Sequence, residues 1–203
     1  LIKMNANVNE QSSNGNTPLF QAINNGNDYI VKLLIDKKAN LYQNDNEGKS
    51  PLDIAKIKNN KNININQQYL INNGANVNYE NEKGLTPLIY AIHKENLKMI
   101  DLLISHHVEI DKKNKNDGTT SLMYAINSQK MEIIEALVNN GFSLNEKDNK
   151  GETALFYAVR VKNFKIIEYL INHGANVESK NNNYENVLYP AVKSGKIRII
   201  EYL

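Results

Sequence analysis

The chain has 203 residues, with 24 basic and 22 acidic side chains, a formal net charge of +2 and no cysteine. The lack of cysteine excludes disulfide scaffolds, thiolate zinc sites and thiol catalysis. Each half carries a charge of +1 (11 basic minus 10 acidic residues in 1–101, 13 minus 12 in 102–203), so no basic tail points to nucleic-acid binding. No apolar run approaches the roughly 20 residues that span a bilayer.

Near the start of the chain, Thr17 directly precedes an apolar run with helical spacing. Its hydroxyl predicts a helix N-cap, and Pro18 suits the first helical position. A break at Asn25–Gly26 separates this helix from a second one that carries the larger apolar set. The same order recurs further along, with hydroxyl caps predicted at four later positions: Ser50, Thr86, Thr120 and Thr153.

Glycine predicts where the second helices end, because the left-handed conformation costs glycine little. These glycines are Gly74, Gly141 and Gly174. The polar stretch that follows each of them predicts an extended turn or a β-hairpin finger.

A second series of glycines recurs at a nearly constant spacing of 33, 36, 34 and 33 residues. These glycines are Gly15, Gly48, Gly84, Gly118 and Gly151, and Tyr184 stands where the sixth is due. We call these six places the register positions. Such a period indicates stacked repeats. We therefore expect one domain, 1–203, made of a partial repeat at 1–14, repeats at 15–47, 48–83, 84–117, 118–150 and 151–183, and a partial repeat at 184–203.

The sequences that start at the register positions resemble one another: GNTPLFQA, GKSPLDIA, GLTPLIYA, GTTSLMYA, GETALFYA and YENVLYPA. Three second helices end in LINNGANVN, LVNNGFSLN and LINHGANVE. On these residues the whole chain resembles the ankyrin repeat family. The resemblance implies an all-α, ankyrin-repeat solenoid of stacked helix-turn-helix units with β-hairpin finger loops.

The family's first helix usually opens with T-P-L-H, but no repeat here has histidine at the fourth position. We expect apolar packing at that position instead, with the aspartate as the exception. The residues there are Phe20, Asp53, Ile89, Met123, Phe156 and Tyr189.

Repeat 48–83 is the most irregular, with three extra residues around KIKNNKNININQQYL. Asn66 and Gln67 fall where the neighbouring repeats carry apolar pairs, and a shift of register would let Ile63 and Ile65 supply those contacts. We interpret the insertion as a tolerated loop, and a local bend or a specialised binding edge is the alternative.

We interpret the high number of asparagines, 36, as the result of codon bias in an A- and T-rich genome. A prion-like segment is the alternative. The asparagines are interleaved with well-spaced leucine, isoleucine, valine and alanine, which favours the first interpretation.

Residues that could carry chemistry are few. The adjacent His106 and His107 point apart on a helix and form a poor metal pair, and no hydrolase, zincin or phosphate-loop motif is present. Asp148 and Glu152 flank Gly151 and are expected to be solvated turn residues. We therefore predict no enzyme activity, no cofactor and no metal site.

The resemblance implies that a partner binds to the finger tips and to the exposed side of the first helices, which together form a concave surface. Leu85 and Tyr184 are the preferred anchors, because exposed apolar groups contribute more binding energy than lysine or glutamate. The candidate contact residues are Asn46, Glu47, Lys49, Glu82, Leu85, His93, Lys94, Thr119, Asn127, Asn149, Lys150, Glu152, Arg160 and Tyr184.

Two functions are compatible with this sequence. The first is a non-catalytic scaffold that binds a protein partner on its concave face, as a monomer in the cytoplasm, without nucleic acid and without membrane insertion. The second is a targeting or regulatory segment of a larger enzyme or membrane protein whose active domain lies outside these residues.

Overall fold

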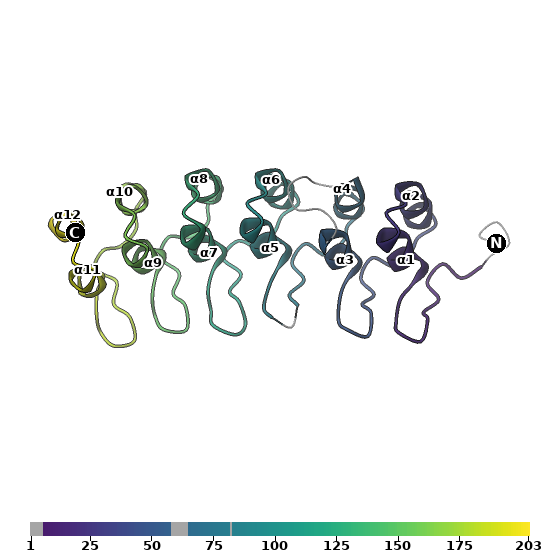
Figure 1. The fold of residues 1–203 in the computed structure, drawn as a ribbon, viewed down its shortest axis with the longest axis horizontal. Helices are drawn as coiled ribbons and strands as arrows, with labels where there is room; N and C mark the ends of the chain where they lie inside the picture. Colours follow the sequence, from purple (N-terminus) through teal and green to yellow (C-terminus); the bar gives the residue numbers. More distant parts are fainter. Residues whose placement is uncertain (1–5, 58–64, 82) are drawn as a thin grey trace. The chain divides into compact units, whose positions relative to one another are not determined.

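The computed structural model describes residues 6–57, 65–81 and 83–203. Within these residues the chain forms twelve helices and no strand, so the structure is all-α, as predicted (Figure 1). The helices are α1 (Pro18–Asn24), α2 (Asp28–Asp36), α3 (Pro51–Ile57), α4 (Ile65–Asn72), α5 (Pro87–His93), α6 (Leu97–Ser105), α7 (Ser121–Ser128), α8 (Met131–Asn139), α9 (Ala154–Arg160), α10 (Phe164–Asn172), α11 (Leu188–Ser194) and α12 (Ile197–Tyr202).

The chain divides into two compact units. The first unit comprises Leu1–Leu88 and Lys98–Val108, and the second comprises Ile89–Leu97 and Glu109–Leu203. In the first unit, α1 packs on α2 and α3, and α4 packs on α2 and α3. In the second unit, α9 packs on α7, α10 and α11, and α12 packs on α11. These helices pack on their own partners and on helices of the adjacent pair, which is the packing of a repeat array. The predicted repeat boundaries stay predictions.

The predicted hydroxyl caps are confirmed in three first helices. Thr17 Oγ1 accepts a hydrogen bond from the main-chain N–H of Phe20 at 3.5 Å, and Thr120 Oγ1 accepts one from Met123 at 3.4 Å. Ser50 Oγ accepts from the N–H of Asp53 at 3.2 Å and donates to its carboxylate at 2.6 Å. These bonds satisfy a donor that the first turn of a helix leaves free.

Thr153 does not form the predicted cap. It precedes α9, makes no side-chain cap bond, and its fully buried Oγ1 has no hydrogen-bond partner. The N–H of Phe156 bonds instead to the Thr153 carbonyl oxygen at 3.0 Å.

We predict that Thr153→Val stabilises the protein by about 1 kcal/mol, because it removes a buried hydroxyl that has no partner at nearly constant volume. Thr120→Val is the matched control: it deletes a formed cap and should destabilise the protein by about 1 kcal/mol. Urea unfolding followed by circular dichroism measures both changes. Equal losses for the two variants would contradict this account.

The fourth position of the first helix is mostly apolar and buried, as expected. Phe20, Ile89, Met123 and Phe156 are at most 1% exposed, and Asp53 is the polar exception. The expectation is wrong for Tyr189, which is 61% exposed. Tyr189 belongs to α11, which packs on α9 and α12.

Asn66 and Gln67 of α4 occupy the core positions that the sequence assigned to them, at 4% and 3% exposure. Gln67 Nε2 donates to the Ala55 carbonyl oxygen at 3.4 Å, whereas Asn66 Oδ1 is buried without a partner. The polar pair is therefore not moved out of the core by a shift of register. Ile63 lies outside the described residues.

The fingers are tight turns in which one pair of main-chain hydrogen bonds closes five residues. In finger 148–152, the N–H of Asp148 bonds to the Glu152 carbonyl oxygen at 3.0 Å, and the N–H of Gly151 bonds to the Asp148 carbonyl oxygen at 2.9 Å. Finger 181–185 repeats both bonds, with Tyr184 in the glycine position at φ 62°. A single closing pair is too short to count as a regular strand.

Candidate functional site: a groove beside two fingers

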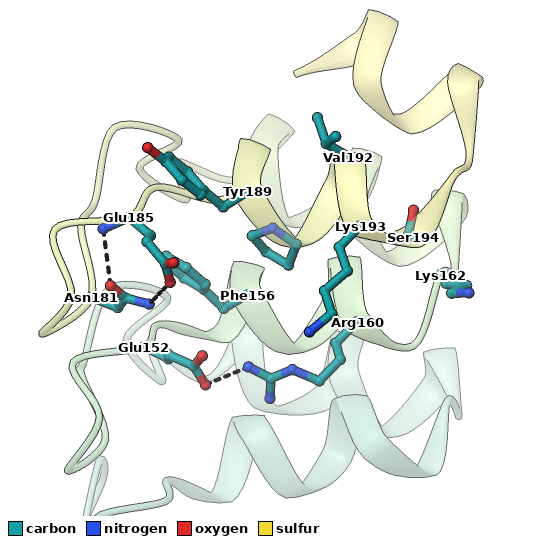
Figure 2. Close-up of a pocket in the computed structure, with 11 residues that line it drawn as sticks. Glu152, Phe156, Arg160, Lys162, Asn181, Glu185, Tyr189, Val192, Lys193 and Ser194 are labelled. Atoms are coloured by element: carbon teal, nitrogen blue, oxygen red, sulfur yellow. Dashed lines mark hydrogen bonds and ion pairs between the residues drawn. The ribbon is translucent and has the colours of Figure 1, made fainter.

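A groove of about 670 Å³ lies in the second unit, between the first helices α9 and α11 and the fingers 148–152 and 181–185. The helices contribute apolar and basic side chains, and the fingers contribute acidic ones (Figure 2). Its lining residues are Glu152, Phe156, Arg160, Lys162, Asn181, Glu185, Tyr189, Pro190, Val192, Lys193 and Ser194.

Arg160, the last residue of α9, is fixed at the floor of this groove. Its guanidinium forms an ion pair with Glu152 and lies 5.1 Å from the centre of the Tyr157 ring. Because guanidinium groups stack on aromatic faces as well as pairing with carboxylates, both contacts hold the side chain in one place. The finger is thus tied to the end of the helix that follows it.

Asp148 is not the solvated turn residue that the sequence suggested. It is 8% exposed, and its Oδ2 accepts a hydrogen bond from the Tyr157 hydroxyl at 2.8 Å. Its Oδ1 accepts from the N–H groups of Lys150 and Glu152 at 2.8 and 2.9 Å. The carboxylate therefore holds the finger in shape.

Burial raises the pKa of Tyr157 to about 12, and the carboxylates of Asp148 and Glu152 add to the rise, while a hydrogen bond with Thr119 opposes it. An unfolded tyrosine ionises near pH 10. Between about pH 10 and 12 the unfolded chain therefore loses a proton that the folded chain keeps. The contribution of Tyr157 to stability is complete below pH 10 and disappears as the pH rises through 12.

We predict that Tyr157→Phe removes a late step from the tyrosinate absorbance titration at 295 nm, near pH 12. The variant should also lose less stability than the wild type between pH 9 and 11.5. Tyr29→Phe, at an exposed position of α2 (76%), controls for the loss of one chromophore. A late step that persists in Tyr157→Phe would contradict the assignment.

An asparagine two residues before the register position joins three of the fingers to the preceding finger. The N–H of Asn149 donates to the Asp117 carbonyl oxygen at 2.9 Å, and its Nδ2 donates to the Asn116 carbonyl oxygen at 3.3 Å. Asn46 and Asn182 make the same two bonds to their preceding fingers. We call this set the fingertip ladder. The amides of Asn46 and Asn149, both predicted partner contacts, are therefore used within the protein.

The predicted contact residues are spread over both units, and the groove brings together only Glu152 and Arg160. In the first unit, Glu47 and Lys49 pair with each other, and Leu85 is half-buried and so a poorer anchor than expected. The expectation for Thr119 is wrong, because it is 5% exposed. Glu82 lies outside the described residues. The predicted residues that are exposed in the second unit are His93, Lys94, Asn127, Asn149, Lys150, Arg160 and Tyr184.

The sequence did not single out the groove residues of α11. Tyr189 and Val192 are 61% and 59% exposed, and Lys193 extends from the same helix. The available signal was positional: Lys193 follows its register position by nine residues, as Arg160 follows Gly151.

The described residues contain no group of three or more histidine, aspartate or glutamate side chains placed to hold a metal ion. Among the same residues, no helix has both the length and the apolar character needed to cross a membrane.

The family model for ankyrin repeats matches three times, at residues 1–65, 57–148 and 127–203. An ankyrin repeat protein of fowlpox virus (strain NVSL), FPV031, is 36% identical over 116 residues, which are 55% of this chain and 33% of the viral protein. The chain thus spans about a third of the length of this relative.

Solved ankyrin repeat domains share the fold. The crystal structure of the Bcl-3 domain superposes with a TM-score of 0.84 at 21% identity, over 98% of this chain and 87% of that one. The human ASB11 domain superposes with a TM-score of 0.71 at 23% identity, over 94% and 83%.

Proposed function

Because the chain belongs to the ankyrin repeat family, whose repeats generally serve as protein–protein interaction modules and not as catalysts, we propose that it is a scaffold that holds a protein partner. The groove between α9, α11 and the fingers 148–152 and 181–185 is the contact region that we assign to that partner.

The observation that carries the proposal is that the groove contains one basic side chain held by contacts within the protein and other side chains that are exposed to solvent. Arg160 is held by Glu152 and Tyr157, so little side-chain freedom is lost when a partner binds. Lys162 and Lys193 line the same groove and are exposed, so they can contact a partner.

Tyr184 extends the proposed contact region at the finger tip. It is 84% exposed and stands in the left-handed conformation at a register position. At Gly118 and Gly151 a Cβ atom would meet the ladder asparagine of the next finger at 2.5 Å. The remaining exposed contact residues of the predicted set, such as His93 and Asn127, belong to the same proposal.

Site-specific cross-linking tests this proposal. A photoreactive residue placed at Lys193 in the groove should cross-link to a protein in native extract, whereas the same residue at Glu168, on the exposed side of α10, should not. Arg160→Ala should abolish the Lys193 product. Cross-linking from Glu168 alone, or equal products from both positions, would overturn the assignment of the groove.

The alternative function, a targeting or regulatory segment of a larger enzyme or membrane protein, concerns the protein as a whole. The open reading frame that contains these residues decides it, because a catalytic or membrane-spanning segment encoded beside them would favour it. The two functions are compatible, since a targeting segment also acts by holding a partner.

A further inference from the structure

Tyr42 occupies a place where the other repeats carry polar side chains without a ring. Eight residues after the last leucine of α2, α4, α6, α8 and α10 stand Tyr42, Asn78, Asp111, Asn145 and Glu178. The Tyr42 hydroxyl donates a hydrogen bond to the Gly74 carbonyl oxygen at 2.7 Å, and Asn145 Nδ2 donates to the equivalent oxygen, that of Gly174, at 3.1 Å. An asparagine therefore suffices for this bond, and the tyrosine ring is not needed to make it.

The ring of Tyr42 is exposed to solvent and yet held in place. Its exposed fraction is 66%, and the hydrogen bond to Gly74 fixes its outer end. The residues around it come from three successive helix pairs of the first unit, because Lys38 follows α2, Gly74 follows α4 and His107 follows α6. Repeats on both sides of Tyr42 are thus present and leave its ring uncovered. A ring held in this way loses little side-chain freedom when a ligand covers it.

Two hollows lie beside Tyr42, one of about 260 Å³ and one of about 310 Å³. Ile35 and Leu41 belong to the first, Ile71 and Val77 belong to the second, and all four side chains are at most 8% exposed. Tyr42 lines both hollows and so forms a ridge between them. We call Tyr42 and the two hollows the Tyr42 ridge.

The ridge fits the spacing of an extended peptide. Carbon atoms in contact with the two faces of one ring lie about 7–8 Å apart, which is twice the 3.5–4.0 Å of a single contact. Alternate residues of an extended strand are roughly 6.6 Å apart and point to the same side. Two apolar side chains two residues apart can therefore enter the two hollows at once.

The charge at the ridge favours an acidic ligand. The described residues that line the two hollows include Lys38, His106 and His107 but no aspartate or glutamate. Lys38 is exposed and forms no ion pair with any described residue. A carboxylate brought to the first hollow would therefore meet a cation and no like charge.

We propose that the Tyr42 ridge is a second contact region, which binds an extended segment of a protein partner. Two aliphatic or proline side chains of that segment, two residues apart, occupy the two hollows, and an aspartate or glutamate beside them is set against Lys38. The ridge lies wholly in the first unit and the groove lies in the second, so this inference goes beyond the proposed function. A charge pair at such a surface selects among partners and speeds their encounter.

A random library of unphosphorylated 12-residue peptides, displayed on phage and selected against the full chain, tests the inference. The wild type should enrich peptides in which two aliphatic or proline residues lie two positions apart beside an acidic residue. Tyr42→Asn is the decisive variant, because asparagine can keep the bond to Gly74 but removes the ring. The selected peptides should bind this variant roughly 30-fold more weakly, as expected when a tyrosine at the centre of an interface is lost.

Lys38→Glu should weaken the binding of the same peptides about tenfold, because two like charges then face each other, and should itself enrich lysine or arginine at the acidic place. Two matched controls should bind as the wild type does. Tyr29→Asn removes a tyrosine of the same unit that is 76% exposed and lines neither hollow. Lys98→Glu makes the same charge change at an exposed position of α6. Circular dichroism establishes that each variant keeps the fold.

Several results would overturn the proposal. Equal binding to the wild type and to Tyr42→Asn, or selection of no peptide that depends on Tyr42, would show that the ridge is not a peptide site. Dependence on Tyr42 without any effect of Lys38→Glu would show that the acidic part of the ligand is wrong. A wild-type dimer that becomes a monomer in Tyr42→Asn, measured by sedimentation equilibrium, would identify the occupant as a second copy of the chain. Peptides that lose binding in Arg160→Ala but not in Tyr42→Asn would belong to the groove, so that the ridge proposal fails while the proposed function stands.

Discussion

Gly151→Ala is expected to destabilise the protein by about 2–5 kcal/mol, although it adds a single methyl group. Gly151 has a φ of 77°, a region that costs other residues about 1–2 kcal/mol. A Cβ atom there would lie 2.5 Å from Asn182 Oδ1 and 2.8 Å from the main-chain nitrogen of Asn182. Overpacking of this kind adds about 1–3 kcal/mol, and relieving it would separate two fingers of the ladder.

Gly141→Ala is the matched control. Gly141 has a φ of 83°, but a Cβ atom there would meet nothing within 4 Å. Gly141→Ala should therefore lower the free energy of unfolding only by the cost of the left-handed backbone conformation, about 1–2 kcal/mol. Urea unfolding of both variants measures the difference. If the two losses are equal, the contact with Asn182 contributes nothing, and the register glycine is explained by its backbone conformation alone.

A second-site substitution separates the two atoms of Asn182 that crowd Gly151. Asn182→Gly removes the Oδ1 contact and leaves the main-chain nitrogen in place. Combined with Gly151→Ala, it should recover part of the lost stability but not all of it, because the 2.8 Å approach of the nitrogen remains. Complete recovery would show that the amide side chain alone carries the conflict.

Those features of the fold that depend on local sequence were predictable. A hydroxyl before proline or alanine, followed by apolar residues at helical spacing, specifies a first helix through its own neighbours. Thr153 shows the limit of this reasoning. Its local sequence is as good a cap signal as that of Thr120, but the hydroxyl is left without a partner. Thr17 has the same phenylalanine at the fourth position and does form its cap, so neither the local sequence nor that residue decides the outcome.

The fingertip ladder was not predicted, although its residues recur visibly in the sequence. Asn149 bonds to Asn116 and Asp117 of the preceding finger, which lie 33 and 32 residues earlier in the chain. In a sequence with 36 asparagines, the recurrence of asparagine two residues before four of the six register positions is hidden by the general excess of this residue. The glycine that follows was predicted from its spacing, but the reason for the glycine lies partly in the ladder.

The candidate site was predicted in part, for a related reason. Glu152 and Arg160 were found by position, because they belong to a complete repeat. Lys193 and Tyr189 were missed because they belong to the divergent repeat after Tyr184, where proline and tyrosine replace the residues that the other repeats have at those positions. The burial of Asp148 was also missed, since it depends on Tyr157, nine residues further on, folding back over the finger.

Leu170→Ala is expected to destabilise the protein by about 2–5 kcal/mol, which combines lost burial with the cost of a cavity. Leu170 is completely buried in α10, as are Ile166 and Ile167. Ile171→Ala is the matched control, because Ile171 lies next to Leu170 on the same helix but is only half-buried. It removes an equal number of side-chain carbons and should cost less.

The loss at Leu170 should not stay local, because each helix pair is stabilised by the pairs beside it. Helix α9 packs on α7, α10 and α11, so a loosened α10 weakens the support of α9. We therefore expect hydrogen exchange in Leu170→Ala to accelerate in α9 and α11 as well as in α10, whereas Ile171→Ala changes α10 alone. Faster exchange confined to α10 in both variants would show that this helix opens independently and that stacking does not couple it to its neighbours.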